Sequence, residues 1–276
     1  MIEQRAHDGF ALPAIGLGTY GLNGIAGAAS VRSAVEAGYR LVDSAFNYEN
    51  EGTVGRGVRD ADADRASVIV TSKLPGRHHE FDAALRTVEE SVYRTGLDAI
   101  DLYLIHWPNP AVGRYDEAWR ALVEARDRGL VRHIGVSNFL PEHLERLEAE
   151  TGVRPVVNQI ELHPYFPQAE AVEYHRERGI IVEAWSPVGR GNDVTAQPVV
   201  GEIAAAHGVS PVQAILAWHV ARGVVPLPKS ADPGRQRENL AAAEVSLAPD
   251  EVAAITALGR PDGRLKGQDP AVYEEF

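Results

Sequence analysis

Arg40-Leu-Val-Asp-Ser-Ala-Phe-Asn-Tyr-Glu-Asn-Glu51 is the stretch of this sequence that indicates its fold most directly. Arg40 to Ser44 has the composition of a short buried strand, and Asp43 stands near its C-terminal end. Tyr48 follows on the loop before the next helical pattern. An acid and a phenol are costly to bury without partners. At the carboxyl-end rim of a parallel barrel, however, such side chains are typical catalytic groups.

Two later strands also end in a polar side chain. Val68-Ile-Val-Thr-Ser-Lys73 ends in a lysine, and Ile100-Asp-Leu-Tyr-Leu-Ile-His106 ends in a histidine. Side chains alternate across a strand, so Asp43, Lys73 and His106 can share one face with the residues two positions before them. We interpret Asp43, Tyr48, Lys73 and His106 as a proton-transfer set. The alternative is a buried Asp43–Lys73 ion pair beside an ordinary core histidine. Four such groups at three consecutive strand ends favour the first interpretation.

These four groups could divide the work of moving a proton. A free tyrosine has a pKa of about 10, too high for easy proton exchange at neutral pH. A neighbouring Lys73 cation would stabilise the Tyr48 phenolate and lower that pKa. Asp43 would hold Lys73 in place and keep it charged. His106 could orient a carbonyl oxygen and share in stabilising the negative charge that develops on it.

Strand and helix patterns alternate from Ala14 onward without a break in composition. Helix-starting prolines stand at Pro141 and Pro211. Glycines that can end a helix precede several of the strands. The eight predicted strands are Ile15–Thr19, Arg40–Asp43, Val68–Leu74, Ile100–His106, Val131–Ser137, Val156–Gln159, Ile180–Trp185 and Val224–Pro228. This pattern predicts an α/β fold, a (β/α)8 TIM barrel, with residues 1–276 as a single domain.

Two further segments complete the predicted barrel. Asp8-Gly9 lies between short runs in residues 3–12, which is typical of a β-hairpin that plugs one end of the fold. The glycine- and proline-containing tail to Phe276 is predicted to be a C-terminal loop over the active-site face. A helix is expected at Arg235–Ala242, after the eighth strand.

Composition limits the classes of partner. The chain has 39 acidic and 27 basic residues and a formal net charge of −12, which argues against nucleic-acid binding. It has no cysteine, so disulfides and thiolate chemistry are excluded. No apolar run reaches the roughly 20 residues that span a bilayer, and the start lacks a signal-peptide pattern. We expect a cytoplasmic monomer without nucleic-acid or membrane partners. A local basic patch of Lys229, Arg235 and Arg237 could still bind an anion.

Two motifs resemble known sites without meeting their context. Gly16-Leu-Gly-Thr-Tyr-Gly21 matches the dinucleotide-binding pattern of a Rossmann fold, but no helix starts at its third glycine. We interpret it as a glycine-rich loop that lets a ligand approach the backbone. His78-His79-Glu80 could suggest a metal, but neighbouring histidines point apart and no third ligand has helical spacing. A solvated loop is the preferred interpretation, and no metal site is predicted.

Five motifs resemble the aldo-keto reductase family, in particular its bacterial 2,5-diketo-D-gluconate reductase-like branch. The resemblance covers nearly the whole chain. It implies a barrel that binds NADPH without a Rossmann fold and reduces the aldehyde or ketone group of a small molecule to an alcohol. The motifs are Gly38-Tyr-Arg-Leu-Val-Asp-Ser-Ala-Phe-Asn-Tyr48, Leu104-Ile-His-Trp-Pro108, Gly135-Val-Ser-Asn-Phe139, Asn158-Gln-Ile-Glu-Leu-His-Pro164 and Pro226-Leu-Pro-Lys-Ser230.

The resemblance implies a role for each matching residue. Asp43, Tyr48, Lys73 and His106 take the catalytic positions, with Tyr48 as the proton donor. Trp185 takes the position that stacks on the nicotinamide, where many members carry Tyr. The nicotinamide carboxamide would be held by Ser137, Asn138 and Gln159, and the pyrophosphate by the loop of Ser186, Val188 and Gly189. The adenosine end would be held by Lys229, Ser230, Arg235, Glu238 and Asn239, with Lys229 and Arg235 pairing with the 2′-phosphate.

The substrate pocket is less well marked. Tyr20 matches a position where many members carry a substrate-contacting Trp, a departure that alters the pocket. Trp107 could line the pocket or be an ordinary core residue. Phe46 or Asn47, just before Tyr48, could also reach it.

Two other functions remain open from the sequence. Some relatives of the family are non-enzymatic nicotinamide-sensing subunits, but the intact set of four catalytic positions argues against that role here. A barrel hydrolase using His106 and Asp43 would lack both a metal cluster and an activated nucleophile, and it would not need Lys229 or Arg235.

Overall fold

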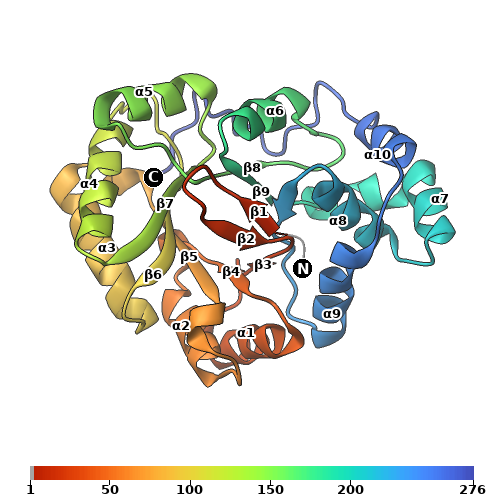
Figure 1. The fold of residues 1–276 in the computed structure, drawn as a ribbon, viewed down its shortest axis with the longest axis horizontal. Coiled ribbons are helices and arrows are strands. Elements are labelled where there is room, and N and C mark those ends of the chain that lie inside the picture. The colour runs from red at the N-terminus through yellow and green to blue at the C-terminus, as the bar shows by residue number, and fades with distance from the viewer. Residues whose placement is uncertain (1–2) are drawn as a thin grey trace.

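The computed structural model describes residues 3–276, which fold into a barrel of strands surrounded by helices (Figure 1). The strands are β1 (Glu3–Arg5), β2 (Ala11–Pro13), β3 (Leu17–Gly18), β4 (Leu41–Asp43), β5 (Ile69–Leu74), β6 (Ile100–Ile105), β7 (Val131–Ser137), β8 (Val157–Glu161), β9 (Ile181–Trp185) and β10 (Val224–Pro226). The helices are α1 (Gly24–Ala37), α2 (Glu51–Asp60), α3 (Phe81–Thr95), α4 (Tyr115–Asp127), α5 (Pro141–Thr151), α6 (Ala169–Glu177), α7 (Pro198–Ala206), α8 (Pro211–Ala221), α9 (Pro233–Ala241) and α10 (Pro249–Thr256).

The predicted TIM barrel is confirmed. Strands β3 to β10 form one parallel sheet in sequence order, and their ends lie within two residues of the predicted positions. The sheet closes where β3 meets the chain after β10. There the Gly16 amide donates to the Pro226 carbonyl at 3.1 Å, and the Gly18 amide donates to the Pro228 carbonyl at 3.1 Å.

The glycines of the Gly16–Gly21 motif serve this closure. A Cβ on Gly18 would lie 2.8 Å from the Leu227 carbonyl oxygen, and one on Gly16 would lie 2.6 Å from the Leu227 side chain. Real Cβ atoms do not approach backbone oxygens so closely, so a side chain at Gly18 would force the seam apart. α1 starts at Gly24, three residues after the motif ends, which agrees with the rejection of a Rossmann fold. These glycines are therefore needed where two segments of the chain pack closely together, and Gly18 also lines the cavity described below.

The N-terminal hairpin covers the amino-terminal end of the barrel. β1 and β2 pair antiparallel across the barrel mouth that faces the viewer in Figure 1. The His7 amide donates to the Gly179 carbonyl just before β9 at 2.8 Å, and the Phe10 ring stacks on His133 of β7 at 4.0 Å. Leu12 is fully buried against the barrel interior. The predicted hairpin is confirmed, and its second strand extends to Pro13.

The barrel interior changes from apolar to polar along the strands. Near the hairpin it is filled by a buried cluster that includes Leu41, Leu102, Val157 and Ile181. Two positions further along their strands, Asp43, Gln159 and Glu183 share the same inward face and are also buried. The polar layer therefore lies at the carboxyl ends of the strands, where barrel enzymes place their sites.

Most helix boundaries follow the expected signals. Pro141 and Pro211 are the first residues of α5 and α8, and Gly38 ends α1 with a φ of 115°. α9 is an exception, because it begins at Pro233 rather than at the predicted Arg235. The Asp232 carboxylate accepts the Arg235 amide at 2.8 Å, so the cap and the proline start the helix two residues early.

α7 and α8 have the most apolar sequences among the helices. α8 buries Ile215, Leu216 and Trp218 completely. In the described part of the chain, no single helix is both long enough and apolar enough to cross a bilayer. α7 and α8 together would reach that length and composition, but they are bent by 86° from one another.

The C-terminal tail, residues 257–276, has neither helix nor strand and crosses the carboxyl-end face of the barrel. The Arg260 amide donates to the Tyr165 carbonyl at 3.1 Å, and the Leu265 amide donates to Glu161 Oε1 at 2.5 Å. Near its end, Glu275 reaches the loop after β5. The predicted loop over this face is confirmed.

Candidate active site

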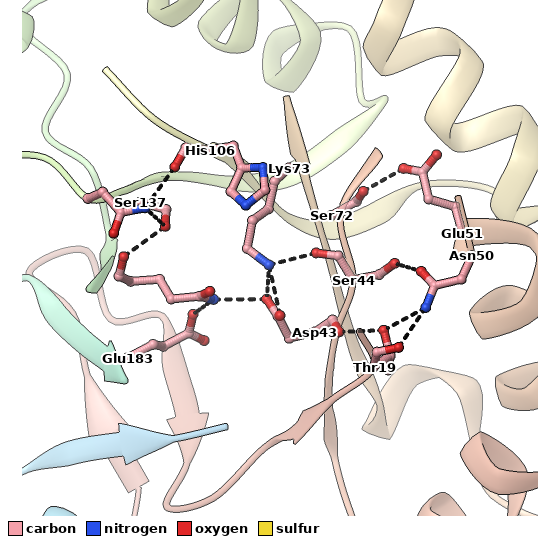
Figure 2. Close-up of polar contacts among 12 residues, drawn as sticks. Thr19, Asp43, Ser44, Asn50, Glu51, Ser72, Lys73, His106, Ser137 and Glu183 are labelled. Carbon is pink, nitrogen blue, oxygen red and sulfur yellow. Dashed lines mark hydrogen bonds and ion pairs between the residues drawn. The ribbon is translucent and has the colours of Figure 1, made fainter. Parts of the chain in front are cut away.

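Asp43 and Lys73 form a buried ion pair at the centre of the polar layer (Figure 2). Lys73 Nζ donates to both Asp43 carboxylate oxygens at 2.6 and 2.7 Å and to the Ser44 carbonyl at 2.7 Å. Burial alone would lower the pKa of Lys73. Asp43 and the other acidic groups around it outweigh burial, so the pKa of Lys73 is raised and the ammonium stays charged.

A second network holds the end of β4 in place. The Ser44 hydroxyl donates to Asn50 Oδ1 at 2.7 Å, and Asn50 Nδ2 donates to the Thr19 carbonyl at 2.8 Å. The Thr19 hydroxyl donates to the Asp43 carbonyl at 2.8 Å and completes the link (Figure 2). Asn50 therefore joins the loop of Tyr48 to β3 and β4. No sequence pattern indicated this role, since Asn50 is an ordinary residue before a helix.

Tyr48 lies in a short 3₁₀ turn, Phe46–Tyr48, above this pair. Lys73 Nζ is 5.0 Å from the centre of the Tyr48 ring, and the His106 ring is 5.9 Å from it, centre to centre. The structure thus brings the four predicted groups together. Burial raises the pKa of Tyr48, and Lys73 lowers it by less. The pKa of Tyr48 is therefore raised overall, and the expected lowering of this pKa is wrong. The direction of the Lys73 effect is as predicted.

His106 has a partner that the sequence did not indicate. Its Nδ1 lies 2.8 Å from Glu275 Oε1 of the C-terminal tail. The carboxylate is off the ring N–H direction, and Nδ1 makes no well-formed hydrogen bond among the described residues. The two groups therefore lie close together without a well-formed hydrogen bond between them. The tail pattern predicted a covering loop but marked no single residue in it.

A cavity of about 530 Å³ opens above these groups. Lys73 is fully buried and does not line it. The residues proposed for the cofactor and the substrate that do line it are Tyr20, Trp107, Ser137, Asn138, Gln159, Trp185, Ser186, Val188 and Lys229. Asp43, Tyr48 and His106 complete the wall at the catalytic end.

The side-chain amides of Asn138 and Gln159, which line the cavity, are held by hydrogen bonds to other side chains. Trp185 Nε1 donates to Asn138 Oδ1 at 2.8 Å, and Asn138 Nδ2 donates to the Ser137 hydroxyl at 3.0 Å. Gln159 Nε2 donates to Asp43 Oδ1 and to Glu183 Oε2, both at 2.8 Å. Gln159 therefore joins the ion pair to a second buried acid.

Glu183 is that second acid, and sequence reasoning missed it. It is fully buried, and its Oε1 has no hydrogen-bond partner among the described residues. Burial, with the nearby Asp43 charge, raises its pKa from 4.5 to about 8. This shift favours the protonated form of Glu183 beside the Asp43–Lys73 ion pair. Glu183 and Trp185 are two positions apart on β9 and therefore share one face of the strand, which is the signal that could have identified Glu183.

Glu183→Gln is expected to change the pH dependence of stability. Folded Glu183 keeps its proton up to a pH of about 8, whereas the unfolded chain releases it near 4.5. Between these values the folded state binds more protons, so its free energy of unfolding falls as pH rises, by about 1.4 kcal/mol per pH unit. Gln lacks this effect. Urea unfolding at several pH values between about 5 and 8 should show the variant gaining on the wild type as pH rises.

Glu177→Gln is the matched control for that measurement, because Glu177 is exposed on α6. Its stability should track the wild type across the whole range. Parallel curves for Glu183→Gln and the wild type would mean that Glu183 is already ionised at neutral pH.

The residues predicted for the adenosine end are only partly joined to the cavity. Lys229 lines it, while Ser230, Arg235, Glu238 and Asn239 lie outside it, on or just before α9. Arg235 is exposed in the first turn of α9, where the capping Asp232 carboxylate also lies. Asp232 already supplies an anion at this helix start. The Arg235 cation at this position therefore does not by itself require a bound anion.

Aromatic and cationic side chains form the opening of the cavity. Tyr20 is 60% exposed, and the Arg190 guanidinium lies 5.4 Å from its ring centre. The Trp107 ring lies 4.5 Å from Tyr273 of the tail and 6.5 Å from Trp185, so Trp107 is both buried and part of the wall. The lining residues that the sequence did not predict include Arg190, Lys266, Gln268, Tyr273 and Glu275.

Of the two residues before Tyr48 that could reach the pocket, Asn47 lines the cavity, whereas Phe46 packs against Arg94, whose guanidinium lies 4.2 Å from its ring centre. The expectation of a solvated loop at His78-His79-Glu80 is wrong for His79. His79 is buried rather than solvated, and burial lowers its pKa to about 4, which leaves it neutral. Within residues 3–276, no group of His, Asp and Glu side chains could hold a metal ion.

Known proteins resemble this chain over nearly its whole length. The model of the Aldo/keto reductase family matches residues 14–260. 2,5-Diketo-D-gluconic acid reductase B from Corynebacterium sp. is 51% identical over 270 residues, which cover 98% of this chain and 97% of the relative. Morphine 6-dehydrogenase from Pseudomonas putida is 40% identical, with 96% and 93% covered. The crystal structure of a Gox0644 mutant in complex with NADPH matches with a TM-score of 0.93 at 42% identity, covering 99% of this chain and 98% of that one.

Proposed function

The chain belongs to the aldo/keto reductase family, and on that premise we propose that it reduces aldehydes and ketones to alcohols with NADPH. One observation carries this proposal. The Tyr48 phenol stands at a cavity wall with a buried, charged Lys73 5.0 Å from its ring centre and the His106 ring beside it. This is the arrangement needed to give a proton to a carbonyl oxygen.

The side chains around the cavity fit a reduced nicotinamide dinucleotide. Trp185 offers an aromatic ring, while Ser137, Asn138 and Gln159 offer the polar atoms that a carboxamide would pair with. Ser186, Val188 and Gly189 would follow the pyrophosphate, and Arg190, a cation on the same loop, lines the cavity beside them. Lys229 and the residues of α9 would take the adenosine end. When bound, the cofactor supplies the hydride.

The protein's own groups handle the proton and the charge. Tyr48 donates its hydroxyl proton to the carbonyl oxygen as the carbon is reduced. Lys73 stabilises the phenolate that remains, and Asp43 fixes Lys73 through two hydrogen bonds. His106 orients the carbonyl oxygen. Solvent then returns a proton to Tyr48 through the open cavity.

The test is the loss of NADPH absorbance with a panel of aldehydes, ketones and sugar-derived dicarbonyls. Turnover that yields one alcohol per NADPH consumed is the expected result. Tight NADPH binding without turnover on any panel member would instead favour the nicotinamide-sensing role. No observation in the structure favours that role over catalysis.

Arg235→Ala is expected to weaken NADPH binding much more than NADH binding. A charge-assisted hydrogen bond to the 2′-phosphate contributes about 1.5–3 kcal/mol, or roughly 10- to 150-fold in Kd. NADH lacks this phosphate. Titration by protein fluorescence with each cofactor gives the two Kd values. Arg237→Ala, an equal charge change on the same helix, should weaken both only slightly. Equal losses for the two cofactors in Arg235→Ala would mean that Arg235 does not contact the 2′-phosphate.

We further propose that residues 1–276 work as a single-domain monomer in the cytoplasm, acting on a small-molecule carbonyl without nucleic-acid or membrane partners. The absence of cysteine supports the cytoplasmic location, and the net charge of −12 argues against nucleic-acid binding. Size-exclusion chromatography with light scattering, and fractionation of the source cells, test the two parts of the proposal separately.

A further inference from the structure

The C-terminal tail places one buried carboxylate where three loops of the candidate site meet. Glu275 Oε1 accepts a hydrogen bond from Asn47 Nδ2 at 2.8 Å and lies 2.8 Å from His106 Nδ1. Its Oε2 accepts the Gly76 amide at 2.9 Å. Asn47 directly precedes Tyr48, and Gly76 follows Lys73 by three residues. The single carboxylate thus touches the turn that carries Tyr48, the loop that follows the strand of Lys73, and His106 itself.

The backbone of Glu275 is held as firmly as its side chain. Asn109, on the loop after β6, accepts the Glu275 amide at 3.0 Å and donates to the Glu275 carbonyl at 2.8 Å. A Cβ on Gly76 would lie 2.6 Å from the Glu275 carbonyl oxygen and 2.4 Å from Asn109 Nδ2. The loop after β5 therefore packs directly against the tail at this point, with no space for a side chain at position 76.

The charges around Glu275 favour its ionised form. Burial raises its pKa, but His106, the Gly76 amide and Asn47 together outweigh burial and lower it. The other groups that face the cluster are the neutral His79 and the Arg77 guanidinium, which donates to Asn47 Oδ1 at 2.6 Å. An ionised, buried carboxylate accepts stronger hydrogen bonds than a neutral amide would.

We propose that Glu275 is a positioning residue of the active site, whose carboxylate holds His106, the turn of Tyr48 and the loop after the strand of Lys73 at a fixed spacing. The inference rests on the proposed function, because it assigns Glu275 to the same reaction. Glu275 acts through its neighbours and does not itself exchange a proton with substrate. The same anchor fixes the tail, whose Tyr273 packs on Trp107 in the cavity wall.

Glu275→Ala and Glu275→Gln test this proposal against Glu274→Gln. Displacing a catalytic group by about 1 Å can cost about 100-fold in rate, so kcat should fall by about that factor in Glu275→Ala and by less in Glu275→Gln. The Kd for NADPH should stay within about twofold, because the contacts of Glu275 lie at the carbonyl end of the site. Glu274 is the matched control. It makes the adjacent contact to the Ala111 amide and undergoes the same charge change.

Hydrogen exchange supplies a reading that does not depend on turnover. The Gly76 amide, which donates to Glu275, should exchange faster in both Glu275 variants and stay protected in Glu274→Gln. Formate at high concentration should restore part of kcat in Glu275→Ala, and formamide should not. If the wild type reduces no carbonyl, the proposed function fails, while the Gly76 exchange still tests the anchor.

Two results would overturn the positioning role. One is a kcat within about twofold of the wild type in Glu275→Ala. The other is an equal loss of kcat in Glu274→Gln, which would assign the effect to tail packing in general rather than to this carboxylate.

Discussion

Tyr48→Phe is expected to lower kcat for carbonyl reduction by roughly 10²- to 10⁴-fold, the usual contribution of a positioned proton donor. The substitution removes one hydroxyl and keeps the ring. The edge-to-face contact of that ring with Tyr20, at 5.2 Å between centres, should remain, as should its position 5.0 Å from Lys73 Nζ. NADPH binding should be nearly unchanged. Steady-state kinetics with a reactive aldehyde and fluorescence titration of NADPH measure the two quantities.

Tyr20→Phe provides the control for that experiment. It removes the same chemical group from a neighbouring ring of the same cavity, and that ring is largely exposed. Its kcat should fall by less than a general acid contributes, about tenfold at most. Wild-type turnover in Tyr48→Phe would assign the proton to another group, and the interpretation of the whole polar layer would have to change.

The sequence predicted the parts of this structure that depend on local patterns. Apolar runs, glycines after helices and prolines at helix starts are properties of a few adjacent residues. They placed eight strands within two residues of their observed ends. Asp43, Lys73 and His106 could be brought together because the carboxyl ends of neighbouring parallel strands lie side by side. The prediction that these three side chains lie together needed only the alternation of side chains along each strand and the order of the strands in the chain.

The parts that the sequence did not predict depend on contacts between distant residues. Glu275 meets Gly76 across 199 positions, and Gln236 donates to Ser30 across 206. No periodicity encodes such pairs. Glu183 was missed for a different reason. A lone acid in an apolar strand resembles a surface position until the neighbouring strands bury it. The pKa of Tyr48 also depended on burial that only the folded chain determines.

Lys73→Met is expected to destabilise the protein by about 3–5 kcal/mol, in addition to removing the support for the Tyr48 phenolate. The reason is the carboxylate that remains. Asp43 is 4% exposed, and the salt bridge with Lys73 is its compensating charge, since Gln159 offers only a neutral amide. Urea unfolding monitored by circular dichroism gives the free energy of unfolding.

The double variant Asp43→Asn with Lys73→Met separates the ion pair from the burial that surrounds it. Removing both charges leaves no uncompensated ion, so the double variant should be more stable than Lys73→Met alone, and the two single losses should not add. Activity should not return with stability, because no cation then faces Tyr48. If instead Lys73→Met loses less than about 1 kcal/mol, water or another hydrogen-bond donor must stabilise the Asp43 carboxylate. The pair would then contribute to the chemistry of the site without contributing to the stability of the fold.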